Sequence, residues 1–328
     1  MNFEASRAKA LDKLNYFVEN NLSEYSKLRN FDFGPENRSN ISCLSPYITH
    51  GIISEKEIIE KSLGKFSFSK NEKFIQEVLW RTYWKGWLEL RPNVWSDYLI
   101  ELNKIKGEFK NNQNYLNAIE GKTNIECFNA WINELKESNY LHNHTRMWFA
   151  STWIFSLGLP WQLGAKFFFK YLFDGDAASN LLSWRWVAGL QTKGKQYLFS
   201  SSNLRKFSNN RFNPETITNK QISFEENFQI PIEDDVYKNN MIQKSEYLLM
   251  FENDLHAESL KNVLPNYKKI FILLLNNEHR KITLSQSVLK FKQELISEFV
   301  SRFEDVIQID PNSIKDIFKY AKQFDVIY

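Results

Sequence analysis

Apolar and aromatic positions recur every three or four residues along the first two thirds of the chain, which is the spacing of an amphipathic helix. The repeat is clearest over residues 73–90, which we expect to form one such helix. Ser54 and Glu57 are spaced as in a helix capping box. Residues 145–158 are apolar almost all round, which predicts a buried helix. We therefore expect residues 1–215 to be a large, all-helical domain.

The pattern changes beyond residue 215. Residues 216–243 hold proline, asparagine and an acidic run, which predicts a linker or an extended wrapping segment. Four short apolar runs follow, with amphipathic stretches between them, as in a small parallel βαβ sheet. These runs are residues 247–251, 269–275, 306–309 and 325–328. The expected fold class is α/β overall, with the helical domain first and a small parallel-sheet α/β domain at 244–328.

Composition excludes several kinds of metal site and makes a membrane protein unexpected. The chain has 328 residues and is 43% hydrophobic, which is enough for one large core or two domains. Cys43 and Cys127 are its two cysteines, too few for an iron–sulfur cluster or a cysteine-rich zinc site, so we expect no metal. They also favour a reducing, cytoplasmic setting. No signal-peptide core and no apolar run of about 18 residues is found, so no membrane span is expected.

Charge is distributed unevenly along the chain. The net charge is +3, but residues 1–220 carry +7 and the remainder −4. Residues 177–214 contain no acid, yet they hold six bases: Arg185, Lys193, Lys195, Arg205, Lys206 and Arg211. A local basic field beside aromatic residues favours a polyanionic partner such as nucleic acid. A solvated basic face is the alternative.

Acidic and amide side chains gather just before two closely spaced tryptophans. Asp174, Asp176 and Asn180 are spaced so that they fall on one turn and the helix start that follows. Carboxylates accept hydrogen bonds and amides donate or accept them, so the group suits the polar edge of a flat cofactor. A helix N-cap is the alternative, because Asp-Gly-Asp before Ala-Ala is good capping chemistry. Arg146 is the expected ion-pair partner of Asp174.

Trp184 and Trp186 stand two residues apart, so their rings point in different directions on a helix or a strand. One ring can then face a cofactor while the other faces a cleft. Burial of both rings in a hydrophobic core is the alternative.

Five motifs, in order along residues 25–212, resemble those of the DNA photolyase and cryptochrome family. They are Tyr25 with Arg29, the Ser-Cys-Leu-Ser loop at 42–45, the helix motif Glu-Val-Leu-Trp-Arg-Thr-Tyr at 77–83, Leu-His-Asn-His-Thr-Arg-Met at 141–147, and the Asp-Gly-Asp to Trp-Arg-Trp run at 174–186. The resemblance implies a helical FAD-binding domain with FAD as cofactor.

The resemblance also implies roles for particular residues. Tyr25, Ser42 and Ser45 would hold the FAD pyrophosphate through hydroxyls and a helix N-terminus. Asn180 would face flavin N5. The full implied set of cofactor-binding residues is Tyr25, Ser42, Leu44, Ser45, Phe74, Asn143, Arg146, Asp174, Asp176 and Asn180.

The implied substrate is a pyrimidine dimer flipped out of damaged DNA, which reaches a buried flavin only in that way. Reduced FAD would donate an electron under blue light, and the electron would return after the ring splits. The implied substrate-binding residues are Arg29, Glu77, Trp80, Asn143, Met147 and Trp186, with the bases at 185–211 gripping phosphates. The implied catalytic residues are Trp184, Trp161, Asn180 and Glu77.

Some positions depart from the family pattern. His144 replaces an arginine that helps to bind the lesion, and Ile41 replaces a threonine of the phosphate loop. The resemblance implies that Trp184 and Trp161 are the inner two tryptophans through which the flavin is photoreduced. The third, outermost tryptophan of that path aligns near Glu108 and Phe109, so Trp153, Trp131 or a tyrosine would have to carry the electron there instead. The α/β part follows the helical domain, whereas photolyases carry an antenna domain before it. This part resembles a relocated, shortened antenna domain, and we expect no second chromophore there.

Three hypotheses remain at this point. The first is blue-light-driven repair of cyclobutane pyrimidine dimers in DNA by electron transfer from reduced FAD. The second is a cryptochrome-like FAD photoreceptor without repair activity, whose C-terminal domain meets a protein partner. The third is a helical nucleic-acid-binding protein without a cofactor, in which the cluster at 174–180 is only a helix cap.

Overall fold

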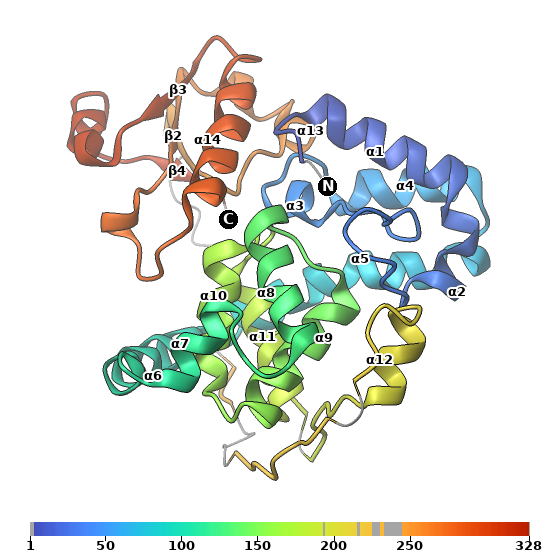
Figure 1. Cartoon of the computed structure of the whole chain (residues 1–328). Coiled ribbons are helices and arrows are strands. Elements are labelled where there is room, and N and C mark those ends of the chain that lie inside the picture. The colour runs from blue at the N-terminus through green and yellow to red at the C-terminus, as the bar shows by residue number, and fades with distance from the viewer. Residues whose placement is uncertain (1–2, 193, 215–216, 225–229, 233–244, 328) are drawn as a thin grey trace.

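The computed structural model describes residues 3–192, 194–214, 217–224, 230–232 and 245–327. The N-terminal two thirds are helical, and a small sheet with its helices follows (Figure 1). The helices of the first part are α1 (Arg7–Asn20), α2 (Tyr25–Leu28), α3 (Ser45–Thr49), α4 (Glu55–Lys65), α5 (Phe68–Glu89), α6 (Pro92–Phe109), α7 (Gln113–Glu120), α8 (Glu126–Ser138), α9 (Asn143–Ser151), α10 (Trp161–Tyr171), α11 (Ala177–Ala188) and α12 (Ser201–Phe207).

Local signals in the sequence explain several of these helices. The Ser54 side chain accepts from the Glu57 backbone N–H, and the Glu57 carboxylate accepts from the Ser54 N–H (2.9 Å), so the predicted capping box begins α4. Helix α5 contains the predicted amphipathic stretch and starts five residues earlier. The predicted buried helix is α9, which continues as a π-helical turn at Thr152–Ser156. These predictions are confirmed.

The sheet has four parallel strands in the order β3-β2-β1-β4. Helices α13 (Ala257–Leu260) and α14 (Gln286–Val300) lie in the connections between them. The strands are β1 (Tyr247–Phe251), β2 (Lys269–Leu273), β3 (Val306–Ile309) and β4 (Asp325–Val326). All of β2 after its first residue is buried, which explains its continuous apolar run. The predicted parallel sheet is confirmed, although β2 and β4 each end two residues earlier than expected.

Two hydrophobic cores hold the chain together. The first is formed mainly by α6 to α11. The second joins α1, α3 and α4 to the sheet and α14, with Leu14 and Ile48 in the same cluster as Met250 and Leu295. Figure 1 shows the orange and red C-terminal elements beside α3 and the start of α1. The sheet therefore buries its apolar face against the N-terminal helices.

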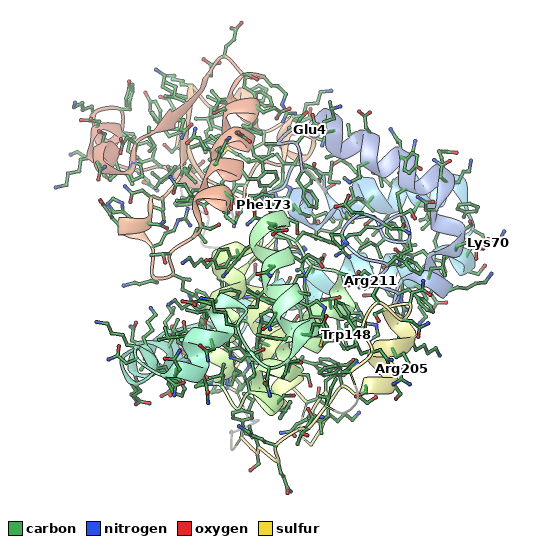
Figure 2. All side chains as sticks on the ribbon, viewed as in Figure 1. Glu4, Lys70, Trp148, Phe173, Arg205 and Arg211 are labelled. Atoms are coloured by element: carbon green, nitrogen blue, oxygen red, sulfur yellow. The ribbon has the colours of Figure 1, made fainter. Side chains whose placement is uncertain are left out.

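Helix α14 contacts the segment that leads into Asp174. The Phe291 ring stacks on Phe173 with centroids 4.3 Å apart at 24°, and Figure 2 shows Phe173 at the junction between the two parts. The Ser285 N–H donates to the Lys170 carbonyl oxygen (2.8 Å), which fixes the start of α14 to the end of α10. The C-terminal part is thus connected to the motif at 174–186 by direct packing.

The predicted linker follows the surface of the first core where it is described. Residues 217–224 and 230–232 contain no helix or strand. Ile222 and Phe224 pack on the first core, and the Lys220 N–H donates to the Phe155 carbonyl oxygen (2.7 Å). Residues 225–229 and 233–244 lie outside the described residues, so the domain boundaries proposed at 215 and 244 stay predictions.

The described residues bear on two of the classes considered above, membrane proteins and metal-binding proteins. None of the helices described is both long and apolar enough to cross a membrane. In the same part of the chain, no three histidine, cysteine, aspartate or glutamate side chains are grouped as a metal ion requires. Cys43 and Cys127 are buried free thiols.

Candidate functional site

The five motifs meet around one cavity of about 710 Å³, a size typical of cavities that hold small molecules and cofactors. Helices α5, α9 and α11 and the loop before α3 contribute to its lining. Of the candidate residues named from the sequence, all but Trp161 and Asp176 line it. Those in the lining are Tyr25, Arg29, Ser42, Leu44, Ser45, Phe74, Glu77, Trp80, Asn143, Arg146, Met147, Asp174, Asn180, Trp184 and Trp186.

A buried carboxylate lies at the centre of the polar part of the cavity. Asp174 Oδ2 accepts from Arg146 Nη2 (2.9 Å) and from the Ser45 hydroxyl, so the expected ion pair is present. Burial raises the pKa of the Asp174 carboxyl, but Arg146, Arg81 and the Ser45 hydroxyl more than offset it, so its pKa lies below the ordinary value. Asp174, which is only 3% exposed, therefore stays ionised.

Three cavity residues carry a buried polar atom without a hydrogen-bond partner among the described residues. They are Asp174 at Oδ1, Ser179 at Oγ and Trp184 at Nε1. Buried polar groups are nearly always hydrogen-bonded in folded proteins. A flat ligand with N–H donors and acceptors along one edge fits these atoms, so this wall suits a polar-edged aromatic cofactor.

Asp176 has a different place from the one predicted. Its Oδ1 accepts from the Ser179 backbone N–H (2.8 Å) as the N-cap of α11, and its Oδ2 pairs with Arg81 of α5. Both oxygens are therefore used within the protein, and Asp176 lies outside the lining. The expected direct cofactor contact is corrected to a supporting role, because the Asp176 carboxylate is held at the start of α11 by the Ser179 N–H and Arg81.

Tyr25, Phe74 and Asn180 are held in place by neighbouring groups. The Tyr25 ring meets Phe74 edge to face at 5.2 Å, and burial raises the pKa of the Tyr25 hydroxyl, which keeps its proton for donation. The Asn180 amide nitrogen donates to the Ala165 carbonyl oxygen (2.9 Å), which leaves Oδ1 as the group available to a ligand. All three side chains are thus oriented before any ligand arrives.

The outer part of the cavity is aromatic. Trp80 of α5 is 48% exposed, and Trp186 of α11 stacks on Tyr197 with centroids 5.6 Å apart at 29°. Glu77 Oε1 lies 3.4 Å from Arg29 Nε, so an ion pair borders the same region. This arrangement offers flat rings and charged edges to a molecule that enters from solvent.

Trp184 lines the cavity, whereas Trp161 lies outside the lining. The Trp184 ring is buried and meets Phe168 edge to face at 5.1 Å. Trp161 stacks on Tyr98 of α6 (5.7 Å, 26°), and Trp95 is 5.4 Å from Tyr98. The implied role of Trp184 and Trp161, as the inner two tryptophans through which the flavin is photoreduced, stays a prediction, and both rings belong to the first core.

Gly164 gives a direct test of the Trp184 position. A Cβ at this glycine would overlap the Trp184 ring, whereas one at Gly107 of α6 would meet nothing within 4 Å. We expect Gly164→Ala to displace the indole, to lower the free energy of unfolding by about 1–3 kcal/mol and to weaken ligand binding in the cavity. Gly107→Ala is the matched control and should stabilise slightly. Urea unfolding of both variants measures the difference, and equal stabilities would contradict this placement of Trp184.

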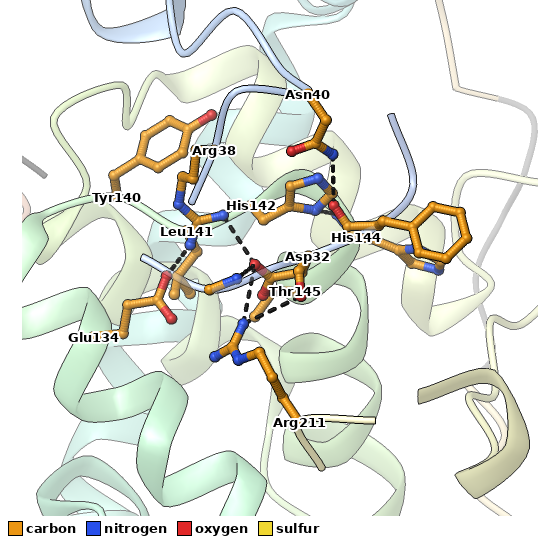
Figure 3. A network of polar contacts seen from close by, with 12 residues as sticks. Asp32, Arg38, Asn40, Glu134, Tyr140, Leu141, His142, His144, Thr145 and Arg211 are labelled. Atoms are coloured by element: carbon orange, nitrogen blue, oxygen red, sulfur yellow. Dashed lines mark hydrogen bonds and ion pairs between the residues drawn. The ribbon is translucent and has the colours of Figure 1, made fainter. Parts of the chain in front are cut away.

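A buried ion network supports the cavity wall that carries Arg29 and Asn30 (Figure 3). Asp32 is fully buried and accepts from Arg38 (3.1 Å), the Thr145 hydroxyl (2.6 Å) and the Gly34 N–H (3.0 Å). Arg38 also pairs with Glu134 of α8. The network ties the loop after α2 to α8 and α9, so the loop has a fixed position beside the cavity.

Glu134 makes stability depend on pH. Burial raises the pKa of its carboxyl from 4.5 to about 7, despite the pairing with Arg38. The folded state then holds this proton more tightly than the unfolded state does. The resulting gain in the free energy of unfolding is full below pH 4.5 and is lost as the pH rises to about 7. In the unsubstituted protein the free energy of unfolding should therefore fall by roughly 2–4 kcal/mol over that range, and we expect Glu134→Gln to abolish this fall. Urea unfolding at several pH values measures it.

The control for that experiment is Glu137→Gln on the exposed side of the same helix. Glu137→Gln should keep the pH dependence of the unsubstituted protein. An unchanged pH dependence in Glu134→Gln would contradict the assignment.

His144 does not line the cavity. Its Nδ1 lies 2.8 Å from the Asn30 carbonyl oxygen, and its ring stacks on Trp148 at 4.5 Å. Burial lowers the pKa of this histidine, which favours the neutral ring. His144, which replaces an arginine of the family pattern, is therefore a structural residue here, and its contact with Asn30 fixes the loop that holds Arg29.

The basic run at 185–211 is only partly a surface. Arg185 is buried, so the expectation that it grips a phosphate is corrected. Arg211 is exposed but pairs with Asp32 (3.3 Å). The other exposed bases in this segment are Lys195, Arg205 and Lys206, and Lys193 lies outside the described residues. A count of charges in the sequence does not distinguish internal ion pairs from exposed cations.

Some residues of the site were not predicted from the sequence. Arg81 pairs with Asp176, and Tyr83, Trp84 and Trp87 extend the aromatic lining. The aromatic residues had a local signal, because positions 80, 83, 84 and 87 share one helix face. The Arg81 pair had none, because its partner is 95 residues away in the chain.

Comparison with known proteins gives a consistent picture. Residues 74–221, which include most of α5 and all of α6 to α12, match the family model described as the FAD binding domain of DNA photolyase. A deoxyribodipyrimidine photo-lyase of Vibrio cholerae is 28% identical over 201 residues, which are 60% of this chain and 41% of that protein. The chain thus spans less than half the length of this relative.

Solved structures agree with this match. A bacterial class III photolyase from Agrobacterium tumefaciens is 26% identical with a TM-score of 0.52, and the match covers 62% of this chain and 43% of that one. A cryptochrome of Synechocystis is 22% identical with a TM-score of 0.55, covering 64% and 44%, and shows a likeness of fold alone.

Proposed function

This chain belongs to the DNA photolyase and cryptochrome family, and from that premise we propose that it is a FAD enzyme that repairs pyrimidine dimers in DNA under blue light. The observation that carries the proposal is the cavity itself. Its lining includes a buried carboxylate, three buried polar atoms without a protein partner among the described residues, and the exposed rings of Trp80 and Tyr83. That combination suits a flat cofactor inside and a flat base beside it.

FAD is the cofactor of the domain that residues 74–221 match. Arg146, Asp174 and Asn180 would hold the polar edge of its ring system, since all three line the cavity and Arg146 pairs with Asp174. Tyr25 and Ser42 would contact its pyrophosphate. When bound and reduced, FAD would supply the electron that splits a pyrimidine dimer on absorption of blue light.

The protein's own residues position the substrate. Trp80 and Trp186 lie in the lining and would stack on a flipped dimer. Asn143 and Met147, at the start of α9, would contact its edges. The Glu77–Arg29 pair would meet the polar base edge and the adjacent phosphate, because it offers an acceptor and a cation side by side.

Purified protein reconstituted with FAD and reduced anaerobically tests the proposal. It should remove dimers from an oligonucleotide with a single thymine dimer under blue light, and not in darkness. Liquid chromatography of the oligonucleotide measures the loss. A colourless protein that takes up no flavin would support a nucleic-acid-binding protein without a cofactor. Light-dependent flavin reduction without dimer loss would instead support the photoreceptor alternative.

A further inference from the structure

One face of α5 carries four large aromatic side chains in a row. Trp80, Tyr83, Trp84 and Trp87, the aromatic strip, follow the i, i+3, i+4, i+7 spacing that places residues on one side of a helix. All four line the cavity. Trp80 and Tyr83 are 48% and 52% exposed, which is unusual for rings of this size. The strip is therefore an apolar surface beside the proposed substrate site.

The rings of the strip support one another. Trp80 and Trp84 stack with centroids 5.6 Å apart at 26°, and Tyr83 meets both edge-on, at 5.4 and 5.1 Å. The Arg91 guanidinium lies over Trp87 at 4.5 Å. These contacts fix ring positions and still leave Trp80 and Tyr83 open to solvent. A preformed row of rings loses little entropy when a flat partner stacks on it.

The charges around the strip favour a polyanion. Arg91 lies over Trp87, and Arg29 lines the same cavity, where it pairs with Glu77. Gln191 and Thr192, from the acid-free segment at 177–214, also line the cavity and add no negative charge. A flat apolar partner carried on a negatively charged backbone fits both features. Unpaired nucleotides have that chemistry, and each base stacked on an aromatic ring contributes about 1–3 kcal/mol.

We propose that the aromatic strip binds unpaired nucleotides next to the target dimer, so that the preferred substrate is single-stranded DNA. This inference rests on the proposed function, since the strip borders the pocket that would receive the dimer. In a duplex, base faces are already stacked on one another and cannot reach Tyr83 or Trp87. A duplex would therefore use the flipped dimer alone, whereas a single strand would gain the strip as well.

Binding of lesion-free DNA measures the contribution of the strip separately from the repair reaction. A fluorescein-labelled oligothymidylate, free or annealed to its complement, is titrated with FAD-loaded protein and followed by anisotropy. We expect the single strand to bind at least about tenfold more tightly than the duplex, and Tyr83→Ala to weaken that binding roughly tenfold. Tyr83→Trp should restore it, because an indole also stacks.

Phe68 supplies the matched control. It lies on the same helix, is 60% exposed and is not part of the cavity lining. Phe68→Ala should leave single-strand affinity unchanged. Equal affinities for single strand and duplex, or equal effects of Tyr83→Ala and Phe68→Ala, would overturn the inference. Loss of a protein dimer in Tyr83→Ala, seen by light scattering, would also overturn it by assigning the strip to self-association.

Repair of the same dimer in both strand forms separates this inference from the proposed function. Equal repair of single strand and duplex would leave the proposed function standing and overturn the role of the strip. Strip-dependent binding of single strands by a protein that removes no dimers in light would reject the proposed function and still support stacking at Tyr83.

Discussion

Asp174→Ala is expected to weaken FAD binding roughly a hundredfold. Asp174 Oδ1 has no partner among the described residues, and Oδ2 holds Arg146 and Ser45 in place. The substitution removes an ionised acceptor in a buried site, and it leaves the Arg146 guanidinium without its carboxylate. Charge-assisted hydrogen bonds in such surroundings are worth about 1.5–3 kcal/mol each, and two or more change at once.

Flavin fluorescence titration of the apoprotein measures this affinity, and thermal unfolding of the apoprotein reports any loss of folding. Asp174→Asn keeps the shape of the side chain without its charge, so its flavin affinity should lie between those of the unsubstituted protein and Asp174→Ala. The apoprotein melting temperature should change far less than the affinity, because the carboxylate is only partly satisfied in the protein alone. Unaltered affinity in Asp174→Ala would reject this wall as the cofactor site.

Phe291→Ala is expected to lower the free energy of unfolding by about 3–5 kcal/mol and to weaken FAD binding as well. Phe291 belongs to α14, outside the residues that match the photolyase family model. Its ring is 3% exposed and stacks on Phe173, the residue before Asp174, at 4.3 Å. It also approaches Tyr47 and His50 of the α3 region, at 6.3 and 5.8 Å. Loss of the ring leaves a void behind two segments of the cavity.

Phe271→Ala is the matched control for this experiment. Phe271 of β2 is 2% exposed, and its ring packs on Tyr320 and Phe324, away from the cavity. Both variants should lose similar stability in urea, whereas only Phe291→Ala should bind FAD more weakly at temperatures where both are folded. Phe291→Leu should recover most of the affinity. Equal flavin affinities in Phe291→Ala and Phe271→Ala would show that the C-terminal part supports folding alone.

Elements whose signal lies within a few neighbouring residues were predicted well. The capping box of α4 depends on Ser54 and Glu57, which are three positions apart, and α5 follows from a repeat of three and four. Strands β1 and β3 coincide with short apolar runs between polar stretches. Periodicity decides these elements because helices and strands place neighbouring side chains on a face in a fixed way.

Prediction failed where one side chain had two competing partners. Asp176 caps α11 and pairs with Arg81, and it lies outside the cavity lining. Arg211 reads as an exposed base in the sequence, yet it joins the network around Asp32, 179 residues earlier in the chain. The outcome in each case depends on which group the fold brings nearest, and local spacing carries no information about that distance.

The sequence by itself determined most of the helical and strand segments, the all-parallel character of the sheet and many of the residues that line the cavity, because these follow from local patterns and from motifs. Only the tertiary structure decided that the Ser45 hydroxyl, 129 positions away, joins the expected partner Arg146 on one oxygen of Asp174. It also decided that the C-terminal sheet shares a core with α1 and α3. These are contacts between segments far apart in the chain, and packing of the whole fold sets them.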